Sequence, residues 1–155
     1  MGKIGKDFKF KVVKNFLSKD ELDLLSIYGE IKHRINGDSF DFVQNNNWDT
    51  YYYGDPIIES LLYKKKQIIE KEVNLNLLGT YAFWRMYTKF SELKKHTDRE
   101  ACEISVTVNI NSDGTEWPIY MNGEAINLNV GDAAIYLGCE VEHWREPFLG
   151  DYQMQ

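Results

Sequence analysis

The residues with the clearest chemical potential are a histidine and an aspartate two positions apart and a second histidine 47 residues later (143 − 96). His96 and Asp98 would reach one metal ion, because side chains at i and i+2 of an extended segment point the same way. With His143 they make two imidazoles and one carboxylate, a set that binds Fe(II) on one face and leaves other positions open. Zn(II) and Mn(II) compete for the same donors. The pattern therefore predicts a metal centre and, with Fe(II), a non-haem iron oxygenase.

The remaining acidic and histidine residues fit this site less well. The chain has three histidines, and the third, His33, lies between Lys32 and Arg34 in a predicted helix, where we expect it to be solvated. Asp132 and Glu142 are the alternative ligands if Asp98 does not bind the metal.

Two helices are predicted ahead of the site, over about 18–35 and 56–73. Ser18 and Glu21 have the spacing of a capping box, and Asp55-Pro56 can cap and begin the second helix. Apolar residues at helical spacing predict one buried stripe on each helix. These stripes consist of Leu24, Leu25, Tyr28, Ile31 and Ile35 in the first helix, and Ile58, Leu61, Leu62, Ile69 and Val73 in the second. Asn36-Gly37 is predicted to end the first helix, and 38–54, which includes Tyr51-Tyr52-Tyr53, to be a long loop.

From about residue 78 the pattern changes to the alternation of strands. Strands are predicted over 81–87, 104–111 and 133–137, with His143 in the next one. Asn122-Gly123, between 119–121 and 124–130, is a strong hairpin signal. We expect a single domain over 1–155, mainly β with N-terminal helices, folded as a jelly roll (double-stranded β-helix, cupin-like). Because 152–155 looks like the start of a strand, we also expect that the natural chain continues beyond Gln155.

Composition narrows the class of protein and its location. Hydrophobic residues make up 43% of the 155 residues and aromatic residues 14%, as in a globular domain. A formal net charge of −6 argues against nucleic acid as a partner. No segment is long enough to span a membrane and no secretory signal is present, so Cys102 and Cys139 are expected to be reduced thiols in a cytoplasmic protein.

Several motifs together resemble the prolyl 4-hydroxylase-like branch of the Fe(II)/2-oxoglutarate dioxygenases. The residues that carry the resemblance are Tyr87 to His96, Asp98, Gly131-Asp132 and His143-Trp144-Arg145-Glu146. It covers roughly 78–150 and implies that His96, Asp98 and His143 bind Fe(II). It also implies that 2-oxoglutarate is the co-substrate, converted with dioxygen to succinate and CO2 while a peptide or small-molecule substrate is hydroxylated.

The resemblance implies less about the residues that bind 2-oxoglutarate. Tyr87 lies nine residues before His96, where a tyrosine of this family contacts the co-substrate carboxylate. The family's usual basic residue, about ten positions after the distal histidine, is replaced by Gln153. Two arginines could take the place of that basic residue, because residues two apart on a strand share a face. They are Arg85, two residues before Tyr87, and Arg145, two residues after His143. We favour Arg85 slightly, because Arg145 could pair with Glu142 or Glu146, although Arg85 could instead bind an anionic group of the substrate.

Two other functions remain open from the sequence. One is a non-catalytic jelly-roll binding domain, suggested by Gln153 and by the early end of the chain. The other is a cupin-like metalloenzyme that does not use 2-oxoglutarate. Tyr51-Tyr52-Tyr53 could form part of a lid over the barrel mouth. The sequence does not predict an oligomeric state.

Overall fold

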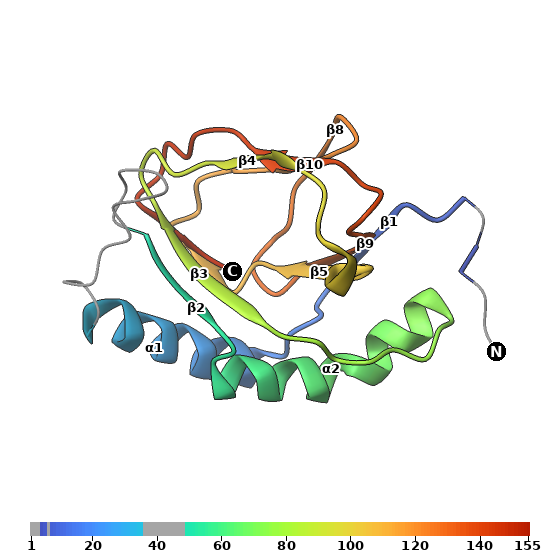
Figure 1. Cartoon of the computed structure of the whole chain (residues 1–155). Coiled ribbons are helices and arrows are strands. Elements are labelled where there is room, and N and C mark those ends of the chain that lie inside the picture. The colour runs from blue at the N-terminus through green and yellow to red at the C-terminus, as the bar shows by residue number, and fades with distance from the viewer. Residues whose placement is uncertain (1–3, 6, 36–48) are drawn as a thin grey trace.

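The computed structural model describes residues 4–5, 7–35 and 49–155, and in this part of the chain two long helices are combined with short antiparallel strands (Figure 1). The helices are α1 (Lys19–Ile35) and α2 (Pro56–Val73), with a short 3-10 helix η1 (Glu100–Cys102). The strands before the metal-site motif are β1 (Phe10–Val13), β2 (Thr50–Tyr53) and β3 (Phe83–Thr88). The others are β4 (Leu93–His96), β5 (Ile104–Val108), β6 (Asn111–Ser112), β7 (Ile119–Met121), β8 (Glu124–Ile126), β9 (Ala133–Leu137), β10 (His143–Arg145) and β11 (Tyr152–Met154).

The strands form two facing layers. One layer combines the sheets β1-β9-β5 and β2-β3-β11-β6, which meet where β5 runs into β6. The Ile110 N–H donates to the Met154 carbonyl (2.9 Å) at this junction. The opposite layer is the small sheet β4-β10-β7-β8. Figure 1 shows α1 and α2 lying along the outer side of β2 and β3, with β4 and β10 across the interior from them. This arrangement is consistent with the predicted jelly roll.

Both long helices begin as the sequence predicted. Glu21 accepts from the Ser18 N–H (2.8 Å), and the Glu21 N–H donates back to Ser18 Oγ (3.3 Å). Asp55 accepts from the N–H groups of the second and third residues of α2 (3.0 and 3.4 Å). These bonds satisfy amides that have no partner within the helix. The predicted end of the first helix at Asn36-Gly37 lies outside the described residues.

The buried face of α1 differs from the predicted stripe. Leu25 and Gly29 are buried, whereas the side chains of Leu24 and Ile35 are 63% and 72% exposed. A Cβ at Gly29 would lie 2.5 Å from Met154 Sδ. The helix therefore lies closest to the sheet at a residue without a side chain, which periodicity of apolar residues does not reveal. In α2 the predicted Ile58, Ile69 and Val73 are buried.

The loop predicted over 38–54 is wrong where the structure describes it. Residues 50–53 form β2, which pairs with β3 in the register Tyr51↔Arg85 and Tyr53↔Phe83. Tyr51-Tyr52-Tyr53 is thus part of a sheet, and β1 and β2 both precede the predicted start of the barrel near residue 78. Both strands have only four residues, too few for a clear alternation of polar and apolar positions. The rest of the predicted loop, 38–48, lies outside the described residues.

The C-terminal half follows the predicted strand order. Asn122 (φ 50°) and Gly123 (φ 90°) form the turn between β7 and β8, and β9 has the predicted bounds. The last strand, β11, lies between β3 and β6 and bonds to both. That the natural chain continues beyond Gln155 stays a prediction.

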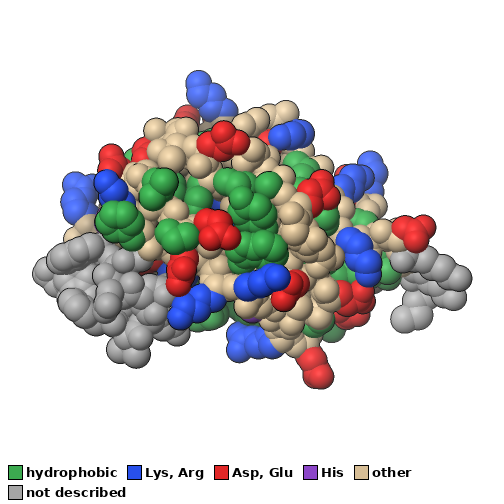
Figure 2. Space-filling view, turned by 90° about the horizontal axis from the view of Figure 1, so that it is seen from above, with side chains coloured by type: hydrophobic (Ala, Val, Ile, Leu, Met, Phe, Trp, Pro, Cys, Tyr) green, Lys and Arg blue, Asp and Glu red, His purple; other side chains and the backbone are tan. Residues whose placement is uncertain are grey.

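Charged side chains of both signs are mixed on the face of the molecule seen from above (Figure 2). Figure 2, which views the molecule from above relative to Figure 1, shows acidic and basic side chains interspersed with apolar ones on that face. Among the described residues, neither helix combines the length and the apolar character that crossing a bilayer requires.

Candidate metal centre

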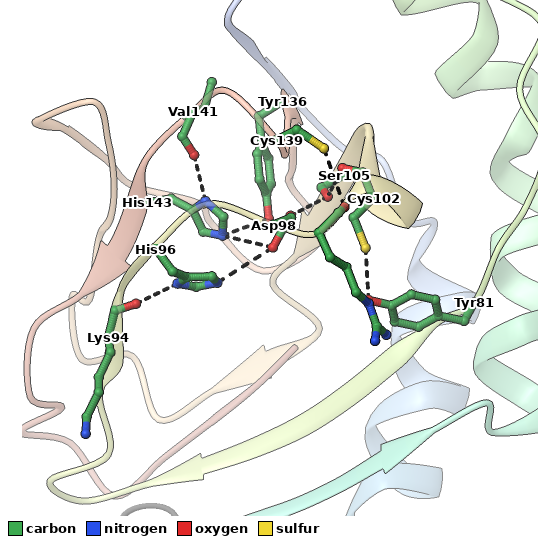
Figure 3. Close-up of polar contacts among 11 residues, drawn as sticks. Tyr81, Lys94, His96, Asp98, Cys102, Ser105, Tyr136, Cys139, Val141 and His143 are labelled. Carbon is green, nitrogen blue, oxygen red and sulfur yellow. Dashed lines mark hydrogen bonds and ion pairs between the residues drawn. The ribbon is translucent and has the colours of Figure 1, made fainter.

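The structure brings His96, Asp98 and His143 together. His96 ends β4 and lies directly opposite His143 in the β4–β10 pairing. Asp98 Oδ1 is 3.6 Å from Nε2 of each histidine, and one donor atom from each residue lies within 4.8 Å of the others. Figure 3 shows both imidazoles directed toward the Asp98 carboxylate. Adjacent ligands bound at about 2.1 Å would be about 3 Å apart, so the three donor atoms would move closer together if they bound one metal ion.

Both histidines are held with the same nitrogen toward the centre. His96 Nδ1 is 2.6 Å from the Lys94 carbonyl, and His143 Nδ1 is 2.9 Å from the Val141 carbonyl. Because a carbonyl only accepts, each Nδ1 carries the proton and each Nε2 presents a lone pair. A hydrogen bond from the other ring nitrogen is the usual support of a metal-binding histidine.

The carboxylate of Asp98 is also held from behind, by two residues that sequence reasoning missed. Ser105 Oγ donates to Oδ2 (2.6 Å), which leaves Oδ1 toward the histidines. The Asp98 N–H donates to the Gly138 carbonyl (2.8 Å). A Cβ at Gly138 would lie 2.6 Å from Asp98 Oδ2 and 2.2 Å from the Cys102 carbonyl oxygen. Only the three-dimensional packing identifies Ser105 and Gly138 as supports.

The electrostatics favour the metal-binding protonation states of Asp98 and His143, whereas in the metal-free protein they favour the protonated form of His96. Burial alone would raise the pKa of Asp98, but the attraction to protonated His96 and the hydrogen bond from Ser105 outweigh burial and lower it. Burial lowers the pKa of His143, while the Asp98 carboxylate raises that of His96. An anionic Asp98 beside a neutral, buried His143 suits a divalent cation. Of the alternative ligands, Asp132 instead bonds to Lys14 and the Asn15 N–H, and Glu142 pairs with Lys95.

Arg145 lies fully inside the molecule on the same strand as His143. Its side chain is 2% exposed, and its Nη1 donates to the Trp117 carbonyl (2.6 Å). Nε and Nη2 have no hydrogen-bond partner among the described residues. Burial lowers the pKa of Arg145 to about 10, and the nearby phenols of Tyr87 and Tyr136 oppose that lowering. The expected alternative, a surface pair with Glu142 or Glu146, is wrong because the guanidinium is buried.

Arg85 is already paired with a carboxylate. Its Nε donates to Asp49 (2.9 Å), and its Nη2 bonds to the same oxygen. Asp49 is 8% exposed and also accepts from the Thr88 N–H (2.8 Å). Asp49 was not singled out from the sequence, because it is 36 residues from Arg85. The sequence favoured Arg85 over Arg145 as the anchor because it did not reveal that Asp49 pairs with Arg85.

The two other positions named for the co-substrate lie side by side. Tyr87 and Gln153 are opposite each other in the β3–β11 pairing, and both are buried. Tyr87 also lines a cavity of about 560 Å³ that includes the three candidate ligands and Arg85. Within it, the hydroxyl of Tyr136 is 3.5 Å from His143 Nε2. The cavity thus joins the candidate metal centre to Tyr87 and Arg85, whereas Arg145 and Gln153 are not among the residues that line it.

Comparisons with known proteins identify similar structures but no similar sequence. No protein-family model and no curated protein matches the chain. A Pseudomonas putida prolyl-4-hydroxylase has a TM-score of 0.69 at 15% identity, over 96% of this chain and 89% of that one. A viral collagen prolyl hydroxylase from Paramecium bursaria Chlorella virus 1, in complex with 2-oxoglutarate, has a TM-score of 0.64 at 13% identity, over 96% and 92%. HygX from Streptomyces hygroscopicus, with nickel and 2-oxoglutarate bound, has a TM-score of 0.68 at 12% identity, over 95% and 80%.

These structural neighbours are the group that the sequence motifs resemble. At 12–15% identity the likeness concerns the path of the chain, not the substrate or the reaction. The chain therefore has the fold of the prolyl 4-hydroxylase-like Fe(II)/2-oxoglutarate oxygenases.

Proposed function

We propose that this protein is an Fe(II)- and 2-oxoglutarate-dependent dioxygenase that hydroxylates an organic substrate. The observation that carries the proposal is the convergence of two Nε2 lone pairs and one carboxylate oxygen in a cavity. His143 is 2% exposed, whereas His96 is 39% exposed, so one side of the centre is enclosed and the other is open. An open side is what a co-substrate, dioxygen and a substrate need.

The proposal includes a finer description of the fold. We assign the two facing layers to the two sheets of a double-stranded β-helix, with α1 and α2 packed on the outside of the larger one. In this assignment the metal ligands lie on the small sheet and at its edge, facing the interior. The TM-scores of 0.64–0.69 with the two prolyl hydroxylases support it.

Fe(II) is the metal that we assign to the centre. Imidazole and carboxylate donors suit it, and the neighbour with nickel and 2-oxoglutarate bound supports a divalent metal beside an oxoacid in this fold. When bound, Fe(II) supplies the redox chemistry that couples dioxygen to the decarboxylation of the oxoacid. This chain supplies Nε2 of His96 and His143 and Oδ1 of Asp98, which Ser105 keeps oriented through Oδ2.

Arg145 is the residue that we assign to the far carboxylate of the 2-oxoglutarate molecule. A buried guanidinium without an anion is costly, so a carboxylate that enters this pocket relieves that cost. Arg145 and His143 are both buried and lie two residues apart on β10, across a shift of register, so the anchor is close enough to the centre for a short dicarboxylate to span them. Tyr87 contributes a phenol next to the same guanidinium. Arg85 is a weaker candidate because Asp49 already neutralises it.

The overall reaction is balanced without a further reductant. A substrate C–H bond, 2-oxoglutarate and O2 give a C–OH group, succinate and CO2, with one oxygen atom in the hydroxyl group and the other in succinate. The substrate class remains as predicted from the sequence, a peptide or a small molecule, and we expect no nucleic acid.

The central test is anaerobic addition of Fe(II) and then 2-oxoglutarate. A bidentate oxoacid on Fe(II) should give a visible charge-transfer band, which His96→Ala should abolish. His33→Ala is the matched control, because His33 bonds to Thr50 away from the centre and its loss should leave the band intact. Metal uptake without the band would favour a cupin-like metalloenzyme that does not use 2-oxoglutarate. No metal uptake would refute the proposal and favour a non-catalytic binding domain.

The anchor has its own test. Arg145→Gln should raise the Kd for the oxoacid by about 100-fold or more, since a charge-assisted bidentate contact is lost. Arg85→Gln should destabilise the fold by leaving Asp49 unpaired but should change that Kd by less than about threefold. The reverse ranking of the two variants would show that Arg85 is the anchor. Succinate release across a panel of peptides and metabolites would then identify the substrate.

A further inference from the structure

A small aromatic cluster lies directly behind Arg145. Tyr87, Trp117 and Phe148 are 5%, 8% and 0% exposed and form a separate buried group. The Trp117 ring meets Tyr87 edge-on at 4.9 Å and lies 4.7 Å from Phe148. The same ring lies 4.7 Å from the Arg145 guanidinium carbon. Trp117 therefore touches both residues that the proposed function assigns to the far carboxylate.

The backbone and the indole N–H of Trp117 fix its position against β10. Nε1 donates to the Glu146 carbonyl (2.7 Å), next to Arg145 in the sequence. The Trp117 carbonyl accepts from Arg145 Nη1 (2.6 Å). One residue thus meets the guanidinium with both its ring and its carbonyl, and it is tied to the end of the same strand by a third contact.

These contacts determine which edge of the guanidinium is left for a ligand. Nη1 is occupied by Trp117, while Nε and Nη2 have no partner among the described residues. Nε and Nη2 form one side of the planar fork, and two parallel N–H groups on one side match the two oxygens of a carboxylate. The ring face also attracts the cation in a site from which water is excluded.

We propose that Trp117 is a positioning residue for the oxoacid pocket: it holds Arg145 and Tyr87 so that the Nε/Nη2 edge of Arg145 faces the far carboxylate of the co-substrate. The inference rests on the proposed function, because it concerns how the same pocket selects its ligand. Trp117 need not touch the oxoacid, and its role acts through Arg145.

The chain offers a matched control tryptophan. Trp144 precedes Arg145 on β10 but points to the other side, where it stacks on Tyr120 with ring centroids 5.1 Å apart. Its Nε1 also bonds to Glu146, through the side chain (2.9 Å). Trp144→Phe therefore makes the same change of ring and removes a similar hydrogen bond without touching the guanidinium.

Calorimetry measures the Kd of the oxoacid for the Mn(II)-loaded protein and, separately, the Kd for Mn(II). Steady-state kinetics with the co-substrate concentration varied give kcat and the KM for the oxoacid. Trp117→Leu should raise both the Kd and the KM for the oxoacid by about tenfold, as loss of a supporting contact typically does. It should leave the Kd for Mn(II) within about twofold of the original. Trp117→Phe keeps a ring behind the guanidinium and should give a smaller rise, and Trp144→Phe should give none. If Trp117→Leu does not fold, Trp117→Phe against Trp144→Phe decides the same question.

The outcomes separate this inference from the proposed function. Weak binding in both Arg145→Gln and Trp117→Leu supports both. Weak binding in Arg145→Gln with unchanged binding in the Trp117 variants overturns the positioning role alone. An equal loss of Mn(II) and oxoacid binding in the Trp117 variants also overturns it, because that is general disruption of the site. If the unsubstituted protein binds no oxoacid in the Mn(II) form, the proposed function fails and this inference fails with it.

Discussion

Replacing Gly138 by alanine should weaken the proposed metal centre without replacing any of its ligands. An added Cβ would lie 2.2 Å from the Cys102 carbonyl oxygen, 2.5 Å from Ser105 Oγ and 2.6 Å from Asp98 Oδ2. Since Cβ atoms almost never approach another heavy atom within 3.0 Å, the Cys102 backbone or Gly138 must move by at least 0.8 Å (3.0 − 2.2). A backbone oxygen cannot rotate away as a flexible side chain can.

This displacement acts on both stability and metal binding. Overpacking of this kind costs about 1–3 kcal/mol in the free energy of unfolding. Because Asp98 bonds to both Ser105 and the Gly138 carbonyl, the same shift moves a proposed metal ligand. We expect the Kd for Mn(II) to rise by about 10–100-fold, the range for the loss of an outer support.

Two glycine controls separate these effects. At Gly29 a Cβ would meet Met154 Sδ at 2.5 Å, in the core under α1 and away from the metal centre, so Gly29→Ala should change stability but not metal affinity. At Gly5 nothing lies within 4 Å, so Gly5→Ala should change neither. Calorimetric Mn(II) titration and urea unfolding measure the two quantities. If the Kd for Mn(II) of Gly138→Ala stays within twofold of the original, the claim that Gly138 keeps Asp98 in place is wrong.

Other contacts lead to three more predictions. Ser105→Ala removes the hydrogen bond to Asp98 Oδ2 and should raise the Kd for Mn(II) by about tenfold, whereas Thr107→Ser, which keeps a hydroxyl beside Gln155, should leave it unchanged in the same titration. Burial alone would raise the pKa of Glu21, but hydrogen bonds from Lys65, the Ser18 N–H and Lys64 hold it at about 2. The stability that Glu21 contributes is thus complete above its unfolded pKa of 4.5 and is lost as the pH falls toward 2. In Glu21→Gln the urea midpoint should therefore change less with pH between 4.5 and 2. An unchanged pH dependence would contradict a stabilising role of Glu21. Asp49→Asn removes the carboxylate that bonds to Nε and Nη2 of Arg85 and should cost about 3–5 kcal/mol in urea unfolding, so a loss below about 1 kcal/mol would show that the pair is not a significant support.

Local sequence signals predicted the elements that local chemistry determines. The capping pairs at Ser18 and Asp55 and the Asn122-Gly123 turn each depend on residues close together in the chain, and each is present as predicted. The bounds of β9 were also predicted, from its own run of apolar residues. The approach of His96, Asp98 and His143 was also predicted, from the spacing of His96 and Asp98, the later histidine and the resemblance to a family with such a ligand set.

Features that depend on distant partners were missed or misjudged. The close contact of Gly29 with Met154 and Trp84 determines which face of α1 lies on the sheet. Apolar residues on other faces of the helix, such as Leu24 and Ile35, are therefore exposed. β2 exists as a strand because β3 pairs with it. The two arginines had equal parity in the sequence, and only Asp49 and the Trp117 carbonyl distinguish them. Such partners lie 28 to 36 residues away, beyond the reach of spacing rules.

The most direct test of the central claim is a crystal structure of the protein with Mn(II) and 2-oxoglutarate under anaerobic conditions, with anomalous diffraction at the manganese edge. We expect one anomalous peak, bound by His96 Nε2, His143 Nε2 and Asp98 Oδ1. We also expect the oxoacid on the metal, with its far carboxylate against Nε and Nη2 of Arg145. A metal ion bound elsewhere would contradict the proposed centre. An oxoacid anchored by Arg85 or Gln153 would contradict the assignment of Arg145.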